Sequence, residues 1–181
     1  MDIIGVDEVG RSSWAGPIVG CAYKLTGRRI EGVNDSKKLS EPKREALYDI
    51  LRAEGKWAIS EVQAWEIDKV GINKANQQVL RNSAQAIYTG KEDIVVDGKY
   101  RIGGLKSRAV VGGDGKVYEI MCASIIGKVY LDRYMRYLAG NFPEYQYYDW
   151  ETNKGYGTPK HKLSIKRSGL SHEHRKSFIH L

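Results

Sequence analysis

The stretch Ile3-Ile4-Gly5-Val6-Asp7-Glu8-Val9-Gly10 decides the fold of this chain. Its β-branched residues predict a short buried strand over residues 2–8 that runs directly into two carboxylates. The same pattern, an apolar run that ends in an acid with glycine close by, returns at residues 94–98 and 110–115. Acids beside glycine at strand ends lie at the open edge of a sheet, where a bulky ligand can approach the backbone. We therefore expect these acids to meet at one edge.

Strands and helices alternate along the rest of the chain. Hydrophobic periodicity predicts further strands at residues 17–25, 56–62, 94–96 and 108–111, and helices over about 41–53, 72–89, 118–139 and 159–168. Mixed elements of this kind favour an α/β or α+β class around one central sheet. The 181 residues are enough for one substantial core. We divide the chain into residues 1–140 and a basic extension, residues 141–181, packed together as a single structural unit.

Composition excludes a disordered or fibrous protein, because 41% of residues are hydrophobic and 28% are charged. The net charge is +7, and it is uneven. Residues 151–181 hold seven Lys or Arg against two acids, and they also contain all four histidines. A basic tail on a nearly neutral body indicates an anionic polymer as partner, nucleic acid first. A merely solubilising surface is the alternative that charge alone leaves open.

The two cysteines, Cys21 and Cys122, are far apart and form no CxxC pair. We expect both to fill core space in a reducing compartment. The N-terminus lacks the basic flank and apolar run of a signal peptide, and no segment is as apolar as a membrane span. These features predict a soluble, cytoplasmic protein that does not act at a membrane.

Four of the acids, Asp7, Glu8, Asp97 and Asp114, belong to the strand-end pattern. Carboxylates gathered at one place raise one another's pKa, and hard divalent cations usually relieve that repulsion. Two such ions could ready a water and stabilise the leaving oxygen of a phosphoryl displacement. The alternative is that each acid only caps a turn or helix. Adjacent strand residues face opposite ways, so a shared ion requires the strand to end or bulge at Asp7-Glu8.

Six segments, in order along the chain, carry a resemblance to a known family. They are Gly5-Val6-Asp7-Glu8-Val9-Gly10-Arg11 with Ala15-Gly16-Pro17, Asn34-Asp35-Ser36-Lys37-Lys38-Leu39-Ser40, Val96-Asp97-Gly98, Ala123-Ser124-Ile125-Ile126-Gly127-Lys128-Val129 with Asp132, Lys154-Gly155-Tyr156-Gly157-Thr158, and His174-Arg175-Lys176-Ser177-Phe178. Together they resemble ribonuclease HII, the type 2 ribonuclease H.

The resemblance implies a ribonuclease H-like fold, with a central mixed β-sheet flanked by helices and a C-terminal helical extension. It implies an endonuclease that cleaves the RNA strand of RNA–DNA hybrids and incises 5′ of ribonucleotides embedded in duplex DNA, leaving 3′-hydroxyl and 5′-phosphate ends. The family's metal-binding acids correspond to Asp7, Glu8, Asp97 and Asp114. The cofactor would be Mg²⁺ or Mn²⁺, two ions per reactive site. Asp132 matches a family position as a supporting residue or, equally, forms a helix-surface salt bridge.

Telling RNA from DNA requires a group that reads the 2′-hydroxyl. The resemblance assigns this reading to the main chain of a Gly-Arg-Gly turn, here Gly10-Arg11-Ser12, with Tyr156. If the turn needs positive φ at its third position, Ser12 is strained or displaced. Two further departures are Gly112, where the family usually has Lys, and Asn153, where it usually has His.

Basic residues are the expected phosphate contacts. We assign substrate binding to Lys37, Lys38, Lys154 and Arg175, and we expect contacts from further tail residues, namely Lys160, Lys162, Lys166 and Arg167. Arg11 could hold the scissile or an adjacent phosphate. We interpret the four histidines, His161, His172, His174 and His180, as surface or capping residues, with support of a phosphate contact by His174 as the minor alternative.

Two alternatives remain beside the leading hypothesis. Ser12 motivates a ribonuclease H-fold nuclease that ignores single ribonucleotides, either a hybrid-only enzyme or a junction resolvase. A hybrid-binding protein without catalysis is the other, although all four acids are present. In each case we expect the chain to act as a monomer.

Overall fold

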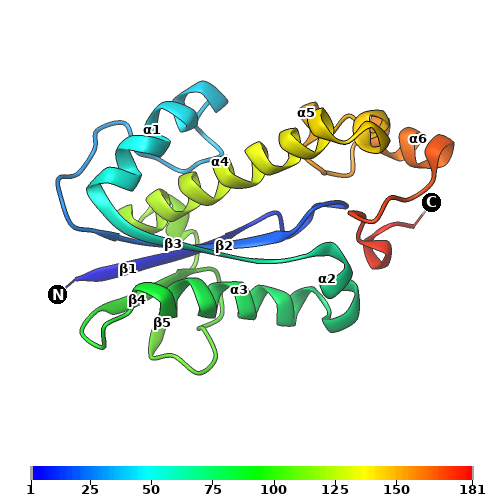
Figure 1. Cartoon of the computed structure of the whole chain (residues 1–181). Helices are drawn as coiled ribbons and strands as arrows, with labels where there is room; N and C mark the ends of the chain where they lie inside the picture. Colours follow the sequence, from blue (N-terminus) through cyan, green and yellow to red (C-terminus); the bar gives the residue numbers. More distant parts are fainter. Residues whose placement is uncertain (1, 181) are drawn as a thin grey trace.

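The computed structural model, which describes residues 2–180, contains a five-stranded sheet in the order β3-β2-β1-β4-β5 (Figure 1). The strands are β1 (Ile3–Val9), β2 (Ile18–Leu25), β3 (Gly55–Val62), β4 (Asp93–Asp97) and β5 (Ser107–Val110). β1 pairs antiparallel with β2 and parallel with β4. β2 and β3 are antiparallel, whereas β4 and β5 are parallel. The predicted central mixed sheet is therefore confirmed, and β1 lies at its middle.

Helices cover both faces of the sheet, with α1 and α4 on one side and α2 and α3 on the other (Figure 1). Their bounds are α1 (Glu41–Glu54), α2 (Ala64–Val70), α3 (Ile72–Ile87), α4 (Tyr118–Asn141), α5 (Trp150–Asn153) and α6 (Pro159–Ser168). Short 3₁₀ helices are η1 (Gly113–Gly115), η2 (Pro143–Tyr148) and η3 (Lys176–Phe178). Sequence periodicity did not indicate α2, because seven residues give too few turns for an apolar stripe.

The core has a layer on each side of the sheet. Cys21, Leu51 and Ile125 bring β2, α1 and α4 together in one layer. Val62 and Val79 bring β3 and α3 together in the other. Both cysteines are free and buried, as the sequence predicts. Because both faces of β1 are covered, this strand is apolar almost throughout, and its only acidic residues, Asp7 and Glu8, come near its end.

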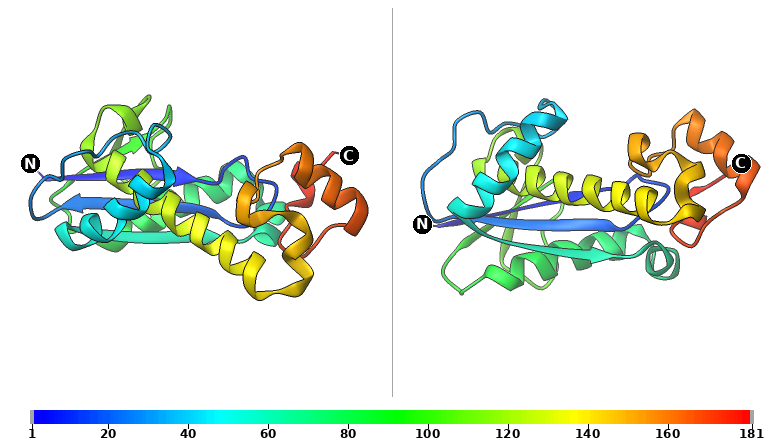
Figure 2. Two further views of the ribbon diagram at one scale, coloured as in Figure 1. Left: turned by 90° about the horizontal axis from the view of Figure 1, so that it is seen from above. Right: turned by 45° about the horizontal axis from the view of Figure 1, so that its top comes forward.

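The C-terminal segment packs against the far end of α4 (Figure 2). Trp150 and Ile165 share a buried cluster with Val19 and Leu131, so residues on both sides of position 140 contribute to one core. Near the end of the chain an isolated β-bridge joins Ala15 to His174. The outer ends of the two predicted ranges, Met1 and Leu181, lie outside the described residues.

From the sequence, Ser40 is predicted to cap the helix over about 41–53, and Thr158 the helix near 159–168. The structure agrees with these two predictions only in part. Thr158 caps α6 through its hydroxyl, which accepts from the His161 N–H at 3.1 Å, as predicted. Ser40 precedes α1, but its side chain makes no capping hydrogen bond. Among the helices within residues 2–180, none has the length and apolar character needed to cross a membrane.

Candidate active site

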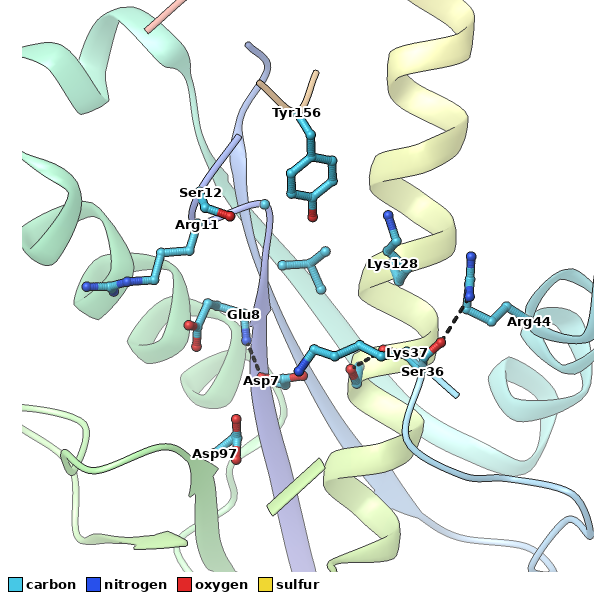
Figure 3. A pocket seen from close by; sticks show the side chains of 13 residues that line it. Asp7, Glu8, Arg11, Ser12, Ser36, Lys37, Arg44, Asp97, Lys128 and Tyr156 are labelled. Atoms are coloured by element: carbon cyan, nitrogen blue, oxygen red, sulfur yellow. Dashed lines mark hydrogen bonds between the residues drawn. The ribbon is translucent and has the colours of Figure 1, made fainter. Parts of the chain in front are cut away.

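A pocket opens where β1 approaches its end, between the sheet and α4 (Figure 3). It is lined by acids at one end and by hydroxyl and basic side chains at the other. The lining residues are Asp7, Glu8, Val9, Gly10, Arg11, Ser12, Ser36, Lys37, Arg44, Asp97, Ser124, Lys128 and Tyr156. Residues from the whole length of the chain therefore meet here, including three of the four predicted acids. We call Asp7, Glu8 and Asp97 with their surroundings the acidic pocket.

Asp7 and Glu8 lie on opposite sides of β1. Asp7 is buried and pairs with Cys21 in the sheet register, on the side covered by α4. Glu8 also lines a second hollow formed with residues of α3. The expectation that the strand ends or bulges at this point is wrong, because β1 continues to Val9 in regular register with β2. Both residues nevertheless line the pocket, although their side chains leave opposite sides of an unbroken strand.

Asp97 ends β4, the strand beside β1, as the sequence predicts. Its carboxylate accepts a hydrogen bond from the Gly113 N–H at 2.6 Å, which ties it to η1. Asp114, in η1, is buried and accepts from the Lys37 ammonium at 2.7 Å. Within residues 2–180, no three acidic, histidine or cysteine side chains are grouped closely enough to hold one ion as they stand. Lys37 occupies the carboxylate of Asp114 instead.

The electrostatics of the pocket favour a cation. Burial raises the pKa of Asp7 well above its usual value, and the neighbouring charges of Glu8 and Asp97 add to the shift. Burial likewise raises the pKa of Glu8, partly offset by Arg11. The acids offer only carboxylate oxygens, the hard donors that Mg²⁺ and Mn²⁺ prefer. The donor set and its uncompensated charge thus fit a divalent ion, although side-chain rotation must complete any coordination.

The turn at residues 10–12 forms one wall of the pocket. Gly10 has φ of 80°, a conformation that a side chain would strain, whereas Ser12 is absent from the positive-φ residues. Serine therefore occupies the third position without backbone strain, and the main chain there is free to keep the turn. The Arg11 guanidinium donates to Asn73 of α3 at 2.6 Å and points away from the acids (Figure 3).

Tyr156 faces the acids from the opposite wall, with its ring directed into the pocket (Figure 3). The Lys128 ammonium lies 5.3 Å from the ring centroid. Asn153 is buried and bonds the backbone on both sides of the turn, donating to the Tyr148 carbonyl and accepting from the Gly155 N–H, each at 2.8 Å. This residue, which departs from the family pattern, thus supports the turn that presents Tyr156.

Two of the predicted substrate contacts are corrected by burial. Arg175 is fully buried, and its guanidinium donates to the carbonyls of Gly10, Arg11 and Gly16 at 2.7, 3.2 and 2.9 Å. Lys154 is also buried and bonds the Glu151 carbonyl, and burial lowers its pKa. Neither side chain is exposed to a phosphate. Arg175 instead holds the turn that was expected to read the sugar.

The histidine prediction is wrong for two of the four residues. His161 and His174 are buried and hydrogen-bonded to each other, whereas His172 and His180 are exposed. Spacing along the sequence did not indicate this pair, because its members are thirteen positions apart and only the fold of the tail brings them together.

Most of the other predicted phosphate contacts are exposed, and of these Lys37 lines the pocket. Lys37 and Lys38 are exposed at the start of the segment before α1, and Lys160, Lys166 and Arg167 are exposed on α6, where Lys162 is half-buried. Next to Gly112 the Lys116 ammonium donates to the Val111 carbonyl at 2.7 Å. Lys116 therefore supplies a cation beside this turn, although the lysine that the family usually has at position 112 is a glycine here.

Sequence reasoning missed a polar group on the α4 side of the pocket. The hydroxyls of Ser36 and Ser124 are 2.9 Å apart, and Arg44 donates to the Ser36 carbonyl at 2.9 Å. Asp132 is buried and accepts from Lys128 at 2.7 Å, so it is not a helix-surface salt bridge. Ser36, Ser124 and Lys128 stand inside the resembling segments, and that was the available signal.

The mixed sheet with helices on both faces is a ribonuclease H-like α/β fold, which solved structures of ribonuclease HII share. A sequence profile of the family described as Ribonuclease HII matches residues 4–181. The chain belongs to the ribonuclease HII family, and it is a ribonuclease H-type endonuclease.

Individual proteins agree with this assignment. Ribonuclease HII of Ruegeria pomeroyi is 40% identical over 179 residues, which cover 97% of this chain and 75% of that protein. The ribonuclease H2 structure from Pyrococcus horikoshii OT3 has a TM-score of 0.78 at 25% identity and covers 98% of this chain and 93% of that one. Bst-RNase HIII in complex with Mn²⁺ shares the fold, with a TM-score of 0.66 at 16% identity over 93% of this chain and 70% of that one.

Proposed function

We propose that this endonuclease cuts the RNA strand of RNA–DNA hybrids and also incises 5′ of single ribonucleotides in duplex DNA, leaving 3′-hydroxyl and 5′-phosphate ends. The observation that carries the proposal is the acidic pocket itself. Carboxylates from β1 and β4 face Tyr156 and the residue 10–12 turn across one pocket. A phosphodiester placed between these two walls would have its phosphate at the acids and its sugar at the tyrosine.

Asp7, Glu8, Asp97 and Asp114 would hold the divalent ions, two in the reactive complex. Bound ions would supply an activated water and stabilise the charge on the leaving oxygen. The carboxylates of these acids would keep the ions at the scissile phosphate. For Asp114 to offer Oδ2 to an ion, the Lys37 ammonium has to leave that oxygen. Lys37 and Lys38 are exposed, and from there they can accompany the phosphates of an incoming strand.

Selection of a ribonucleotide would fall to the main chain of Gly10, Arg11 and Ser12 together with the Tyr156 ring. The hydrogen bonds from buried Arg175 hold the carbonyls of this turn. Because Ser12 lies outside the positive-φ residues, the turn keeps its main-chain groups in place despite the serine. This supports reading of a lone ribonucleotide over the alternative of a hybrid-only nuclease.

The test is incision of a duplex that contains one ribonucleotide, with Mg²⁺ or Mn²⁺, by the wild type and Asp97→Asn. We expect the substitution to lower the rate at least about 100-fold, because changes one step further from a metal already cost 10–100-fold. Equal incision by both proteins would exclude the metal role of Asp97. Cleavage of a long hybrid without incision at a single ribonucleotide would favour the hybrid-only alternative.

A further inference from the structure

Behind Tyr156 lies a buried polar cluster that the proposed reaction does not use. Its members are His161 of α6, His174 of the C-terminal segment and Trp150 of α5, each at most 1% exposed. Rings of Tyr148 and Trp14 pack around the two histidines. No carboxylate hydrogen-bonds to either imidazole among residues 2–180, and burial lowers the pKa of both. The pair is therefore neutral at physiological pH.

The partners of each imidazole fix its tautomer. The Ser171 backbone N–H can only donate, and it lies 2.9 Å from His174 Nδ1, so that nitrogen accepts. The single proton of neutral His174 is then on Nε2. The Trp150 indole N–H also can only donate, and it lies 3.1 Å from His161 Nε2. His161 Nε2 therefore accepts, and its proton is on Nδ1.

These assignments give every hydrogen bond of the pair one direction. His174 Nε2 donates to His161 Nε2 at 3.1 Å. His161 Nδ1 donates to the backbone carbonyl of Tyr156 at 2.9 Å. A chain of donors thus runs from the C-terminal segment through both imidazoles and ends on the backbone of the residue whose ring enters the pocket.

Backbone hydrogen bonds also hold this turn. The Tyr156 N–H donates to the Asn153 carbonyl at 2.9 Å, and the Tyr156 carbonyl also accepts from the Thr158 N–H at 2.8 Å. On the preceding residue, the Gly155 carbonyl accepts from Trp14 and Ala15. His161 is the side chain that fixes the carbonyl of Tyr156 from the core. A shift of this carbonyl would move the ring relative to the acids.

We propose that His161 is a positioning residue that holds the Tyr156 backbone and so sets the place of its ring over the acidic pocket. In this proposal His174, together with Trp150, keeps the proton of neutral His161 on Nδ1. This inference rests on the proposed function, in which Tyr156 contacts the sugar at the cleavage site. Neither histidine touches the substrate, and each acts through Tyr156.

Two substitutions of His161 separate this role from packing. In His161→Asn the amide nitrogen lies near the place of Nδ1, so it keeps the bond to Tyr156 but leaves Trp150 and His174 without an acceptor. In His161→Gln the amide oxygen reaches the place of Nε2, so it keeps those two bonds and loses the one to Tyr156. The variants therefore break opposite ends of the same chain of hydrogen bonds.

Incision at a single ribonucleotide and thermal unfolding are then measured for both variants. We expect His161→Asn to unfold at the lower temperature and to keep kcat/KM near wild type. We expect His161→Gln to be the more stable variant and to lose about tenfold in kcat/KM, because small misplacements of positioning groups cost this much or more. If activity instead follows stability, so that Asn is the worse enzyme, the proposal is overturned.

Nuclear magnetic resonance provides a readout that is independent of cleavage. Nitrogen shifts should show a proton on Nδ1 of His161 and on Nε2 of His174, and Tyr156 signals should move in the Gln variant but not in the Asn variant. Unchanged Tyr156 signals in His161→Gln overturn the positioning role. Moved Tyr156 signals in a protein that does not incise single ribonucleotides uphold the positioning role and contradict the proposed function.

Discussion

The acidic pocket and the cluster behind Tyr156 both contain buried polar groups, but these groups differ in charge and in hydrogen bonding. At the acidic pocket, Asp7 and Glu8 are partly or fully removed from water beside a third carboxylate, and burial raises their pKa values. In the cluster, His161 and His174 are equally removed from water, but each is neutral and fully hydrogen-bonded. The first region stores repulsion that a cation can relieve, whereas the second stores none and can only hold geometry. Chemistry and positioning are thus separated in space.

The largest effect is expected at Asp7, where a substitution should remove the repulsion that distinguishes the acidic pocket from the histidine cluster. We expect Asp7→Asn to lower cleavage about a thousandfold, as removal of one strong electrostatic contact to a reacting group does. In chelator the same variant should unfold at a higher temperature than wild type at neutral pH. Because the pKa of Asp7 is raised in the folded state, ionisation above the usual carboxyl pKa costs the wild type stability, and asparagine removes that cost.

Thermal unfolding in chelator and with added Mg²⁺ checks this prediction. The wild type should gain stability from the ion, and Asp7→Asn should gain much less. A variant that unfolds at a lower temperature than wild type in chelator would contradict the account of stored repulsion.

The cluster should respond to acid in the opposite sense. The pKa of His174 falls from 6.5 to about 4 through burial and the adjacent His161, so the unfolded chain binds the proton more readily. Stability from this residue is complete above pH 6.5 and is lost as pH falls toward 4, by about 3 kcal/mol. The variant His174→Gln keeps a donor near Nε2 and does not titrate in this range.

Denaturant unfolding of both proteins at several pH values measures the difference. Other carboxylates titrate in the same window, but they are common to both proteins and cancel. Parallel pH profiles for wild type and His174→Gln would show that His174 is not held neutral by the fold.

The acidic pocket could be predicted from the sequence, whereas the cluster behind Tyr156 could not. Val6-Asp7-Glu8 and Val96-Asp97-Gly98 predicted the pocket, because acids after a β-branched run lie at or near the end of a strand, although β1 continues past Glu8 to Val9. The cluster could not be predicted, because Trp150, His161 and His174 meet only through the path of α5, α6 and the final segment. Charge was a poor guide for Arg175, since its burial depends on carbonyls near residue 10.

Two arginines at the residue 10–12 turn show that the sequence does not distinguish a buried cation from an exposed one. Arg175 is buried on the carbonyls of Gly10 and Gly16, and Arg11 is exposed on Asn73. We expect Arg175→Lys to lower the unfolding free energy by about 2 kcal/mol, because a single ammonium cannot reach both carbonyls and charged hydrogen bonds are worth this much. Arg11→Lys, the matched control, should change it by about 0.5 kcal/mol. Denaturant unfolding compares them, and equal losses would contradict the buried role.

The smallest expected effect concerns the exposed ion pair between Lys37 and Asp114. The Lys37 ammonium bonds Asp114 at 2.7 Å, although the Lys37 side chain is 78% exposed. An exposed pair of this kind is weak, and a divalent ion that binds Oδ2 of Asp114 must displace the lysine from it. We therefore expect Lys37→Met to bind Mn²⁺ about two- to fivefold more tightly in calorimetry, while Lys38→Met, also exposed but without this carboxylate, stays at the wild-type affinity. Weaker Mn²⁺ binding by Lys37→Met would mean that the lysine supports the ion site instead of competing with the ion for it.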